Sequence, residues 1–364
     1  MKTRKILALL LAALLAALAL VSCSGPNYDE TVMSFNGKEI KGYMYKYWLS
    51  TMKSYFVTVA DDTPEYWAQE LGNGETYESH LKKIITDDIK VRLLLLSYFD
   101  EQGLSLTDEE IAAAEKQAED YLAAYGDEKT LNEKLAVYGV DYARFKEIKV
   151  LEAKYDAAYE HLFVNGEKKV TDVAIDDYYK NNYSLVKILI VNNVFEYSKD
   201  ADGNIVYDPA TGNAVTAVLD DAKKAEKTAL ADTIEGKIKA GEDFDALMKE
   251  YDENVDALYY PNGYYICPND FQKFGADITN AARELAVGET KRVEDETGIY
   301  FVKKLDLPDA GYQNTTDADQ FANLYTYCLA VAQNDYLAAH ESEITVNESA
   351  LKNYTVAGAS ISGK

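Results

Sequence analysis

The sequence has 364 residues, of which 48% are apolar and 27% are charged. This composition is typical of a folded chain with two or three domains, and it excludes an intrinsically disordered one. The net charge of −25 argues against nucleic acid as a partner. No CxxC motif, zinc-type spacing or glycine-rich phosphate loop occurs, so we expect neither a metal ion nor another cofactor.

The first 22 residues have the pattern of a secretory signal peptide. Three basic residues come before an uninterrupted apolar run from Ile6 to Val21, which is short for a membrane span. The end of this run, LVSC at 20–23, resembles the bacterial lipobox, which implies a lipid on Cys23. A signal peptide with a chance cysteine is the alternative. After a tether over 23–30, we therefore expect the mature body at the extracytoplasmic face of the bacterial cell membrane.

Residues 31–178 are predicted to form a helical unit. A short strand with an Asn36-Gly37 turn comes first, and apolar residues then recur every three or four positions, which is the spacing of one buried helix face. The repeats that carry this prediction are Met44, Trp48, Met52 and Phe56, then Leu81, Ile84, Ile85, Ile89, Leu93 and Leu96, and later Phe145, Ile148, Tyr155 and Tyr159.

The apolar period changes within residues 179–308. The run LVKILIV at 185–191 predicts a strong strand, and two turn clusters around Ile205 predict a hairpin within 199–217. The other predicted elements are a helix at 218–240, a short helix from Phe244, a helix at 277–285, and strands at 290–293 and 299–305. This order indicates a compact α+β domain.

Residues 309–364 return to a helical period that includes Phe321, Leu324 and Cys328. A lone amphipathic helix cannot bury its apolar face, so we expect this segment to pack on the N-terminal helices. The predicted fold class is therefore α+β, with the middle domain inserted into a helical unit. We interpret Cys267 and Cys328 as buried thiols, and a disulfide between them is the alternative.

Four stretches of the middle domain resemble the parvulin-type peptidyl-prolyl isomerases. They are LVKILIV at 185–191, KIKAGEDFDALMKEYDEN at 237–254, ELAVGETKRV at 284–293 and ETGIYFVKKL at 296–305. Two further stretches, SFNGKEIKGYMYKYWL at 34–49 and VTDVAIDDYYKNN at 170–182, resemble the N-terminal chaperone domain of SurA and PrsA-type foldases. The resemblance implies a helical chaperone domain at 31–178, a parvulin-like domain at 179–308, and a C-terminal helix and tail at 309–364.

The activity that the resemblance implies is rotation about X–Pro bonds, which takes tens of seconds or longer without a catalyst. A pocket that grips the proline ring and desolvates the twisted amide can lower this barrier without covalent chemistry. In parvulins, two histidines on neighbouring strands, with a Cys or Asp between them, form the polar floor of that pocket. Here Ile188 and Tyr300 occupy the two histidine positions, and His80, His161 and His340 all lie outside the domain.

The same resemblance assigns the remaining site residues. The Cys or Asp position of the family falls near Asn254 or Asp256, and apolar residues of the proline pocket are expected downstream of it. The candidate catalytic residues are Tyr300, Asn254 and Asp256, and the candidate substrate-binding residues are Ile188, Phe274, Ile278 and Leu285. Two interpretations of Tyr300 stay open: its hydroxyl replaces part of the imidazole's role, or it is a half-buried strand residue.

These features predict a membrane-anchored, extracytoplasmic foldase or chaperone of the PrsA/SurA type. Its partners would be unfolded or nascent secreted polypeptides, which expose apolar surface before they fold. Because both family histidines are absent, we expect the isomerase activity to be weak or lost, and an isomerase with a different pocket floor is the alternative. A non-catalytic surface lipoprotein that binds one specific partner or solute is a second hypothesis. A homodimer through the helical unit is compatible with the sequence.

Overall fold

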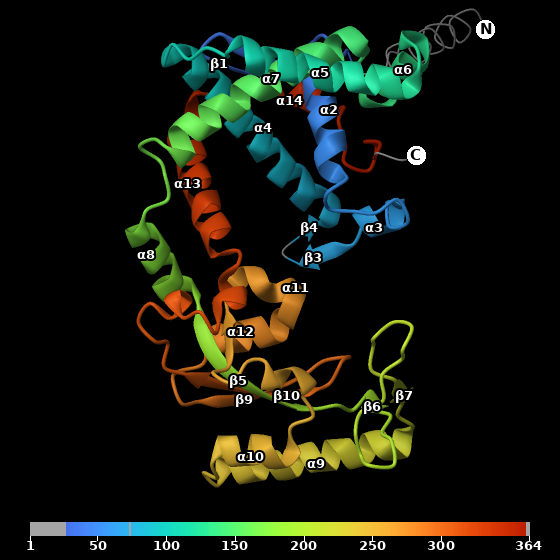
Figure 1. Ribbon diagram of the computed structural model, residues 1–364, viewed down its shortest axis with the longest axis vertical. Helices are drawn as coiled ribbons and strands as arrows, with labels where there is room; N and C mark the ends of the chain where they lie inside the picture. The colour runs from blue at the N-terminus through green and yellow to red at the C-terminus, as the bar shows by residue number, and fades with distance from the viewer. Residues whose placement is uncertain (1–26, 73, 362–364) are drawn as a thin grey trace, which may run out of the picture. The chain divides into compact units, whose positions relative to one another are not determined.

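The computed structural model describes residues 27–72 and 74–361, and Figure 1 shows its helices and strands. The chain divides into two compact units, Met1–Lys169 with Leu329–Lys364 and Val170–Cys328. The sequence placed these boundaries at 178/179 and 308/309. The predicted signal peptide, residues 1–22, and the predicted lipidation site, Cys23, lie outside the described residues. Within the described part of the chain, no helix has both the length and the apolar character that a membrane crossing requires.

The first unit is mainly helical. Its helices are α2 (Gly42–Lys53), α3 (Pro64–Trp67), α4 (Tyr77–Glu101), α5 (Asp108–Tyr125), α6 (Glu128–Leu135), α7 (Tyr142–Tyr159) and α14 (Glu348–Leu351), and a π-helical turn, η2 (Glu160–Val164), continues α7. Its strands are β1 (Thr31–Phe35), β2 (Lys38–Lys41), β3 (Glu70–Gly72), β4 (Glu75–Thr76) and β11 (Thr345–Val346). Helix α13 (Leu324–His340) begins in the second unit and ends in the first.

The C-terminal segment completes the first unit. Strand β11 pairs antiparallel with β1, with Val346 opposite Met33. Strand β1 is joined to β2 by the predicted turn, in which Asn36 and Gly37 both have positive φ, as a tight hairpin requires. Leu337 from α13 lies in the same hydrophobic core as the N-terminal helices. Part of the apolar face of the C-terminal helix is thus covered by the N-terminal helical segment: Leu337 lies in its core, and the Tyr336 ring packs on that of Phe163 at 5.7 Å.

A buried ion pair fixes the C-terminal tail to α2. The Lys53 side chain is fully buried, and its Nζ donates to the carbonyl oxygen of Ala359 at 2.7 Å. The same Nζ lies 2.7 Å from Oδ1 of Asp62 and 5.0 Å from the centre of the Trp67 ring. The indole N–H of Trp67 also donates to Asp62 Oδ1, at 2.8 Å. Lys53 therefore links the end of α2 to the C-terminal tail and to the segment that contains Asp62 and Trp67.

The second unit is built around a four-stranded antiparallel sheet with the order β8-β5-β10-β9. The strands of the unit are β5 (Ser184–Val191), β6 (Phe195–Tyr197), β7 (Thr216–Val218), β8 (Tyr264–Ile266), β9 (Thr290–Glu294) and β10 (Ile299–Leu305). Its helices are α8 (Asp172–Asn182), α9 (Asp221–Lys239), α10 (Phe244–Tyr251), α11 (Phe271–Phe274) and α12 (Ala276–Glu284). With small antiparallel sheets beside its helices, the chain has the predicted α+β fold class.

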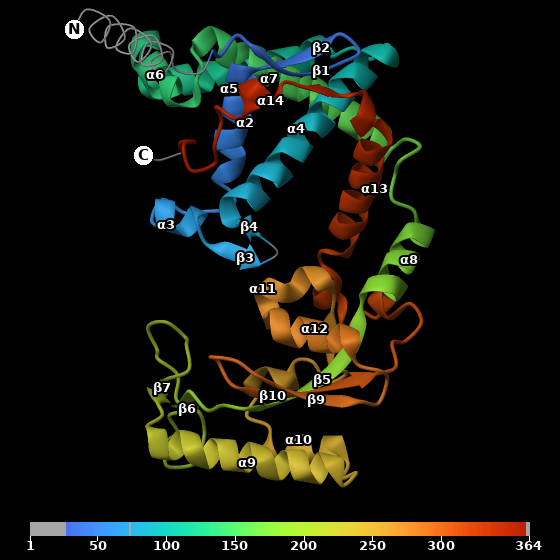
Figure 2. The ribbon, with the colours of Figure 1, turned by 180° about the vertical axis from the view of Figure 1, so that it is seen from behind.

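The central strand β5 is buried on both faces, which explains why its sequence is almost continuously apolar. Leu189 and Val191 face α9 and α10, and Ile188 packs on the other face with residues of α12. Strand β10 alternates in the same way, because Phe301 packs in the core with α9 and α10 and Tyr300 packs in the core with α12. Figures 1 and 2 show the two helix pairs on opposite faces of the sheet. The alternation of the strands therefore decides which side chains can reach a given face.

A third apolar cluster lies at the end of this sheet, where α8 packs on the segment after β10. Aromatic rings make up half of its buried members, among them Tyr179, Tyr183 and Phe321. Cys267 and Cys328 are both buried in this cluster and are both free thiols. Because α8 contributes Tyr179 to this cluster, it packs as part of the second unit, whereas the predicted boundary at 178/179 falls within this helix.

Candidate functional site

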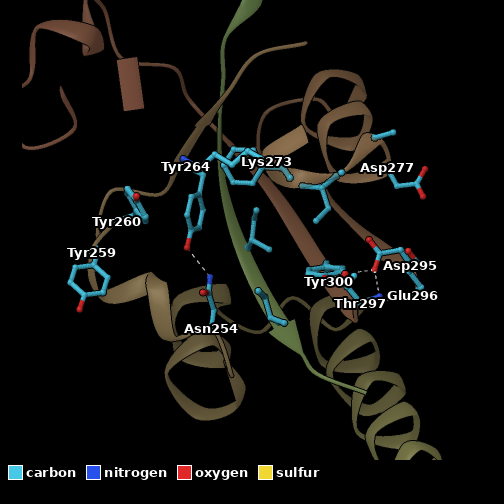
Figure 3. A pocket seen from close by; sticks show the side chains of 16 residues that line it. Asn254, Tyr259, Tyr260, Tyr264, Lys273, Asp277, Asp295, Glu296, Thr297 and Tyr300 are labelled. Carbon is cyan, nitrogen blue, oxygen red and sulfur yellow. Dashed lines mark hydrogen bonds between the residues drawn. The ribbon is translucent and has the colours of Figure 1, made fainter. Parts of the chain in front are cut away.

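A pocket of about 930 Å³ opens on the face of the sheet that α11 and α12 partly cover. The strands β5, β8 and β10, the helix α11, the start of α12, the loop after α10 and the turn between β9 and β10 all contribute to it, as Figure 3 shows. Its lining consists of Ile188, Ile190, Asn254, Tyr259, Tyr260, Tyr264, Lys273, Phe274, Gly275, Ala276, Asp277, Ile278, Asp295, Glu296, Thr297 and Tyr300. This mixture of apolar, aromatic and charged side chains is typical of a ligand-binding pocket.

The floor of the pocket is apolar. Tyr300 lies opposite Ile190 in the β5–β10 pairing, and Ile188 is two residues away on the same strand face. Ile278 reaches this surface from α12, and all but 5% of its surface is buried. These side chains meet because positions two apart on a strand share a face. The floor can therefore take up an apolar ring by excluding water from it.

Tyr300 is held by a chain of hydroxyl and carboxylate groups at one end of the pocket. The Thr297 hydroxyl donates to Oδ1 of Asp295 at 2.6 Å, and the Tyr300 hydroxyl is hydrogen-bonded to the same Thr297 oxygen. A hydroxyl has a single proton, so Thr297 accepts from Tyr300 when it donates to Asp295. The proton of Tyr300 is thus used within this chain. Its oxygen offers lone pairs to the pocket, whereas a catalytic donor would have to offer a proton.

The Tyr300 hydroxyl keeps its proton. Burial is the main cause that raises the pKa of Tyr300 above its ordinary value. The phenol is therefore neutral at physiological pH. A Cβ atom on Gly298 would lie 3.2 Å from the Tyr300 hydroxyl, so the ring lies across the turn that leads into β10.

A second tyrosine borders the other side of the pocket. The side-chain amide of Asn254 donates to the Tyr264 hydroxyl at 2.8 Å, as the dashed line in Figure 3 shows. The Tyr264 ring lies 5.0 Å from the ring of Tyr260 and 5.7 Å from that of Phe274. These three rings form a continuous aromatic wall, which presents flat apolar faces and few flexible atoms to a ligand.

A buried carboxylate places Asn254 at this wall. Asp252 accepts hydrogen bonds from the backbone N–H groups of Ile190, at 2.9 Å, and Asn254, at 3.0 Å. Burial raises the pKa of Asp252 to about 6, although both hydrogen bonds act to lower it. Asp252 therefore ties the loop after α10 to the central strand, and it does so partly protonated in mildly acidic conditions.

Acidic residues outnumber basic ones among the charged side chains that line the pocket. Asp277 stands in the first turn of α12, and Asp295 and Glu296 stand in the turn between β9 and β10. Oδ1 of Asp295 accepts from the backbone N–H groups of Thr297 and Gly298, which fixes this turn. In Figure 3 the three carboxylates lie on one side of the pocket.

The basic residue of the pocket, Lys273, lies toward the aromatic wall. Its Nζ is 5.5 Å from the ring centre of Tyr260 and 5.0 Å from that of Phe274. At these distances the ammonium group interacts with the faces of both rings.

The predicted site residues fall into three groups. Asn254, Tyr300, Ile188, Phe274 and Ile278 line the pocket together. Leu285, which follows α12, packs partly buried against the apolar core of the same sheet face. The backbone of Asp256 lies in the short helix η3 (Val255–Leu258), and its side chain is outside the described part of the structure.

Several pocket residues were not singled out from the sequence. Ile190 could have been found, because it is two positions after Ile188 in a strand and must share its face. Tyr259, Tyr260 and Tyr264 stand close together in the sequence, but nothing local shows that they line a pocket. Asp277 and Asp295 lie in separate elements, and the folding of β9 and β10 beside α12 brings them to one opening.

Among the described residues, no group of His, Cys, Asp and Glu side chains is arranged to hold a metal ion. The hairpin loop around Asp200 uses its carboxylate to accept from the backbone N–H groups of Asp202 and Asn204. Such bonds are typical of a turn that is stabilised by its own side chain.

No protein-family model and no curated protein matches this sequence. Among solved structures, the chain is similar to PrsA from Bacillus subtilis, with 17% identity, 90% of this chain and 93% of the other covered, and a TM-score of 0.22. It is also similar to the peptidylprolyl isomerase PrsA from Bacillus cereus, with 17% identity, 90% and 97% covered, and a TM-score of 0.30.

A third similar structure is a SurA-like chaperone from Campylobacter jejuni, with 11% identity, 87% of this chain and 98% of the other covered, and a TM-score of 0.25. At these identities and scores the similarity carries no argument about activity, which has to come from the pocket. Over most of its length the chain is similar to solved structures of PrsA foldases and of SurA-like chaperones.

Proposed function

We propose that this protein is an extracytoplasmic foldase or chaperone that holds proline-containing segments of unfolded or nascent secreted polypeptides in the pocket of its second unit. The observation that carries the proposal is the pocket itself, in which an apolar floor of Ile188 and Ile278 meets an aromatic wall. A proline ring is apolar and rigid, so such a surface can bind it with a small loss of conformational entropy.

The proposal includes weak or absent isomerase activity. Ile188 cannot donate or accept a hydrogen bond, and the hydroxyl proton of Tyr300 is used by Thr297. An isomerase has to stabilise the twisted amide more strongly than the planar one. The groups that line this pocket are suited to binding a proline ring and not to stabilising the twisted amide selectively.

The proposed location is the outer face of the cell membrane, where a lipid on Cys23 would hold the mature chain. Both parts of this proposal come from the sequence pattern at residues 1–23. Metabolic labelling with a radioactive fatty acid tests it, because a Cys23→Ala variant would lose the label and a lipid anchor would be disproved if the label stayed.

The proposed chaperone activity is tested by aggregation assays with a form of the mature chain that begins at Ser24 and therefore lacks the lipid-bearing Cys23. We expect it to suppress light scattering by several unrelated, chemically unfolded proteins at roughly equimolar ratios. The competing hypothesis of a lipoprotein with one specific partner predicts tight binding to a single ligand and no general suppression. The absence of suppression for every client would contradict the proposed function.

A further inference from the structure

The charged side chains at the mouth of the pocket indicate which proline-containing segments it binds. This argument rests on the proposed function, since it concerns the ligand of the same pocket. The apolar floor and aromatic wall would accept any proline ring, so they provide affinity without selecting the neighbouring residues. Selection has to come from the side chains that surround the floor.

Carboxylates border the pocket from two directions. Asp277 extends from the first turn of α12, and Asp295 and Glu296 come from the turn that precedes β10. The second oxygen of Asp295, Oδ2, would lie 3.9 Å from a Cβ atom on Gly275, directly before α12. Both acidic segments therefore approach each other at one side of the same opening, as Figure 3 shows.

Among the described residues, no ion pair involves the carboxylates of Asp277, Asp295 or Glu296. Lys273 is placed over the rings of Tyr260 and Phe274, on the aromatic wall. The pocket lining thus has three carboxylates and one ammonium group, and its net charge is negative.

The aromatic wall adds to this preference. The position of Lys273 shows that the rings of Tyr260 and Phe274 accept a cation on their faces. The exposed ring of Tyr259 provides a further surface of the same kind at the opening. A lysine or arginine side chain has an apolar stem that could lie along these rings while its charged end reaches the carboxylates.

We infer that the pocket selects proline segments that have a lysine or arginine next to the proline and discriminates against segments with acidic neighbours. The substrate class is a basic, proline-containing stretch of an unfolded polypeptide. Because Asp277 and Glu296 are exposed to solvent, the selectivity is moderate: we expect about three- to tenfold tighter binding of the basic peptide than of the neutral one at low ionic strength.

A peptide series tests this inference with the mature chain. Fluorescent pentapeptides of the form Ala-Xaa-Pro-Ala-Phe, with Lys, Ala or Glu at Xaa, are titrated by fluorescence anisotropy at low and high salt. We expect affinity to fall in the order Lys, Ala, Glu, and the differences to shrink as salt shortens the range of the electrostatic attraction. A fourth peptide with Lys at Xaa and Ala in place of Pro measures the attraction of charge alone.

Two variants locate the source of the selectivity. Asp277→Asn with Glu296→Gln removes two charges at the mouth while keeping side-chain size, and it should bring the Lys and Ala peptides to within about twofold of each other. The matched control, Asp202→Asn with Glu226→Gln, removes two exposed charges of the same unit outside the pocket and should keep the full preference. Far-UV circular dichroism checks that both variants are folded.

The outcomes distinguish this inference from the proposed function. Equal binding of the Lys, Ala and Glu peptides would overturn the selectivity while leaving proline binding intact. A preference that survives in the Asp277 and Glu296 variant, or equal binding of the peptide without proline, would show attraction by the whole acidic surface and would also overturn it. If none of the proline peptides binds, the proposed function of the pocket fails together with the inference.

Discussion

Replacing Lys53 by Met removes the charged centre that joins the C-terminal tail to the first unit. The ammonium group has 2.7 Å contacts with Ala359 and Asp62 and has no exposure to solvent. Methionine has a similar apolar stem, so packing is largely kept and the change mainly removes the charge and its hydrogen bonds. The Asp62 side chain, of which 9% is exposed, would then have to stay buried without its counter-ion.

The expected loss of stability is large. Removing one partner of a buried ion pair destabilises a protein by roughly 3–5 kcal/mol, because the other charge is left uncompensated. The Trp67 indole still donates to Asp62 and reduces the penalty, so we expect about 3 kcal/mol, the lower end of that range. This is a substantial part of the roughly 5–15 kcal/mol that stabilises a typical domain.

Denaturant unfolding followed by tryptophan fluorescence measures this loss. The chain has two tryptophans, Trp48 and Trp67, and both lie in the first unit, so the signal reports on that unit alone. The control Lys129→Met changes an exposed lysine and should alter stability by less than about 0.5 kcal/mol.

A double variant tests the physical cause. Lys53→Met combined with Asp62→Leu leaves no unpaired charge and should recover part of the stability that Lys53→Met loses. The reasoning would be refuted if Lys53→Met were as stable as the control, or if the double variant lost the full sum of the two single effects.

Three further predictions concern the second unit. The folded-state pKa of Asp252, about 6, is above its ordinary value, so its contribution to stability is present below about pH 4 and lost as the pH rises through 6. Asp252→Asn should therefore flatten this decline and raise the free energy of unfolding at pH 7 by on the order of 1–3 kcal/mol. Urea unfolding followed by circular dichroism at a series of pH values measures this. An unchanged slope of the unfolding free energy against pH would contradict the prediction. Tyr300→Phe removes the hydrogen bond to Thr297 and should cost about 0.5–1.5 kcal/mol in the same unfolding assay, while proline-peptide binding changes by less than about twofold. Phe274→Ala opens the aromatic wall and should weaken binding of proline peptides by about tenfold in anisotropy titrations, so an unchanged affinity would show that the rings do not contact the ligand.

The strands and the order of elements in the second unit could be predicted because their signals are local. The run at 185–191 is almost continuously apolar, and the structure shows β5 buried on both faces with its predicted position nearly unchanged. The return of the C-terminal segment also followed from a physical argument, since its helix had an apolar face that needed a partner. Two residues of the predicted apolar faces are exceptions. Ile84 fits the period of α4 but is 40% exposed, although Leu81 and Ile85 beside it are buried, and Phe56 is 52% exposed because α2 ends at Lys53.

The pocket could be predicted only in part, because its composition depends on contacts between distant segments. Ile188 and Tyr300 were found through the resemblance to a family, which fixes positions and not chemistry. The use of the Tyr300 proton by Thr297 depends on how the turn before β10 folds back on the ring, which no spacing in the sequence reveals. The acidic mouth depends in the same way on the approach of that turn to the start of α12.

The central claim is that the pocket holds proline segments and does little to rotate them. Exchange NMR on an Ala-Lys-Pro-Ala-Phe peptide with the mature chain measures binding and cis–trans interconversion in one sample. The account predicts saturable broadening of the proline resonances. It also predicts a cis–trans interconversion rate within about tenfold of the uncatalysed rate, for which the time constant is tens of seconds. Acceleration by several orders of magnitude, or the absence of any broadening at saturating protein, would contradict it.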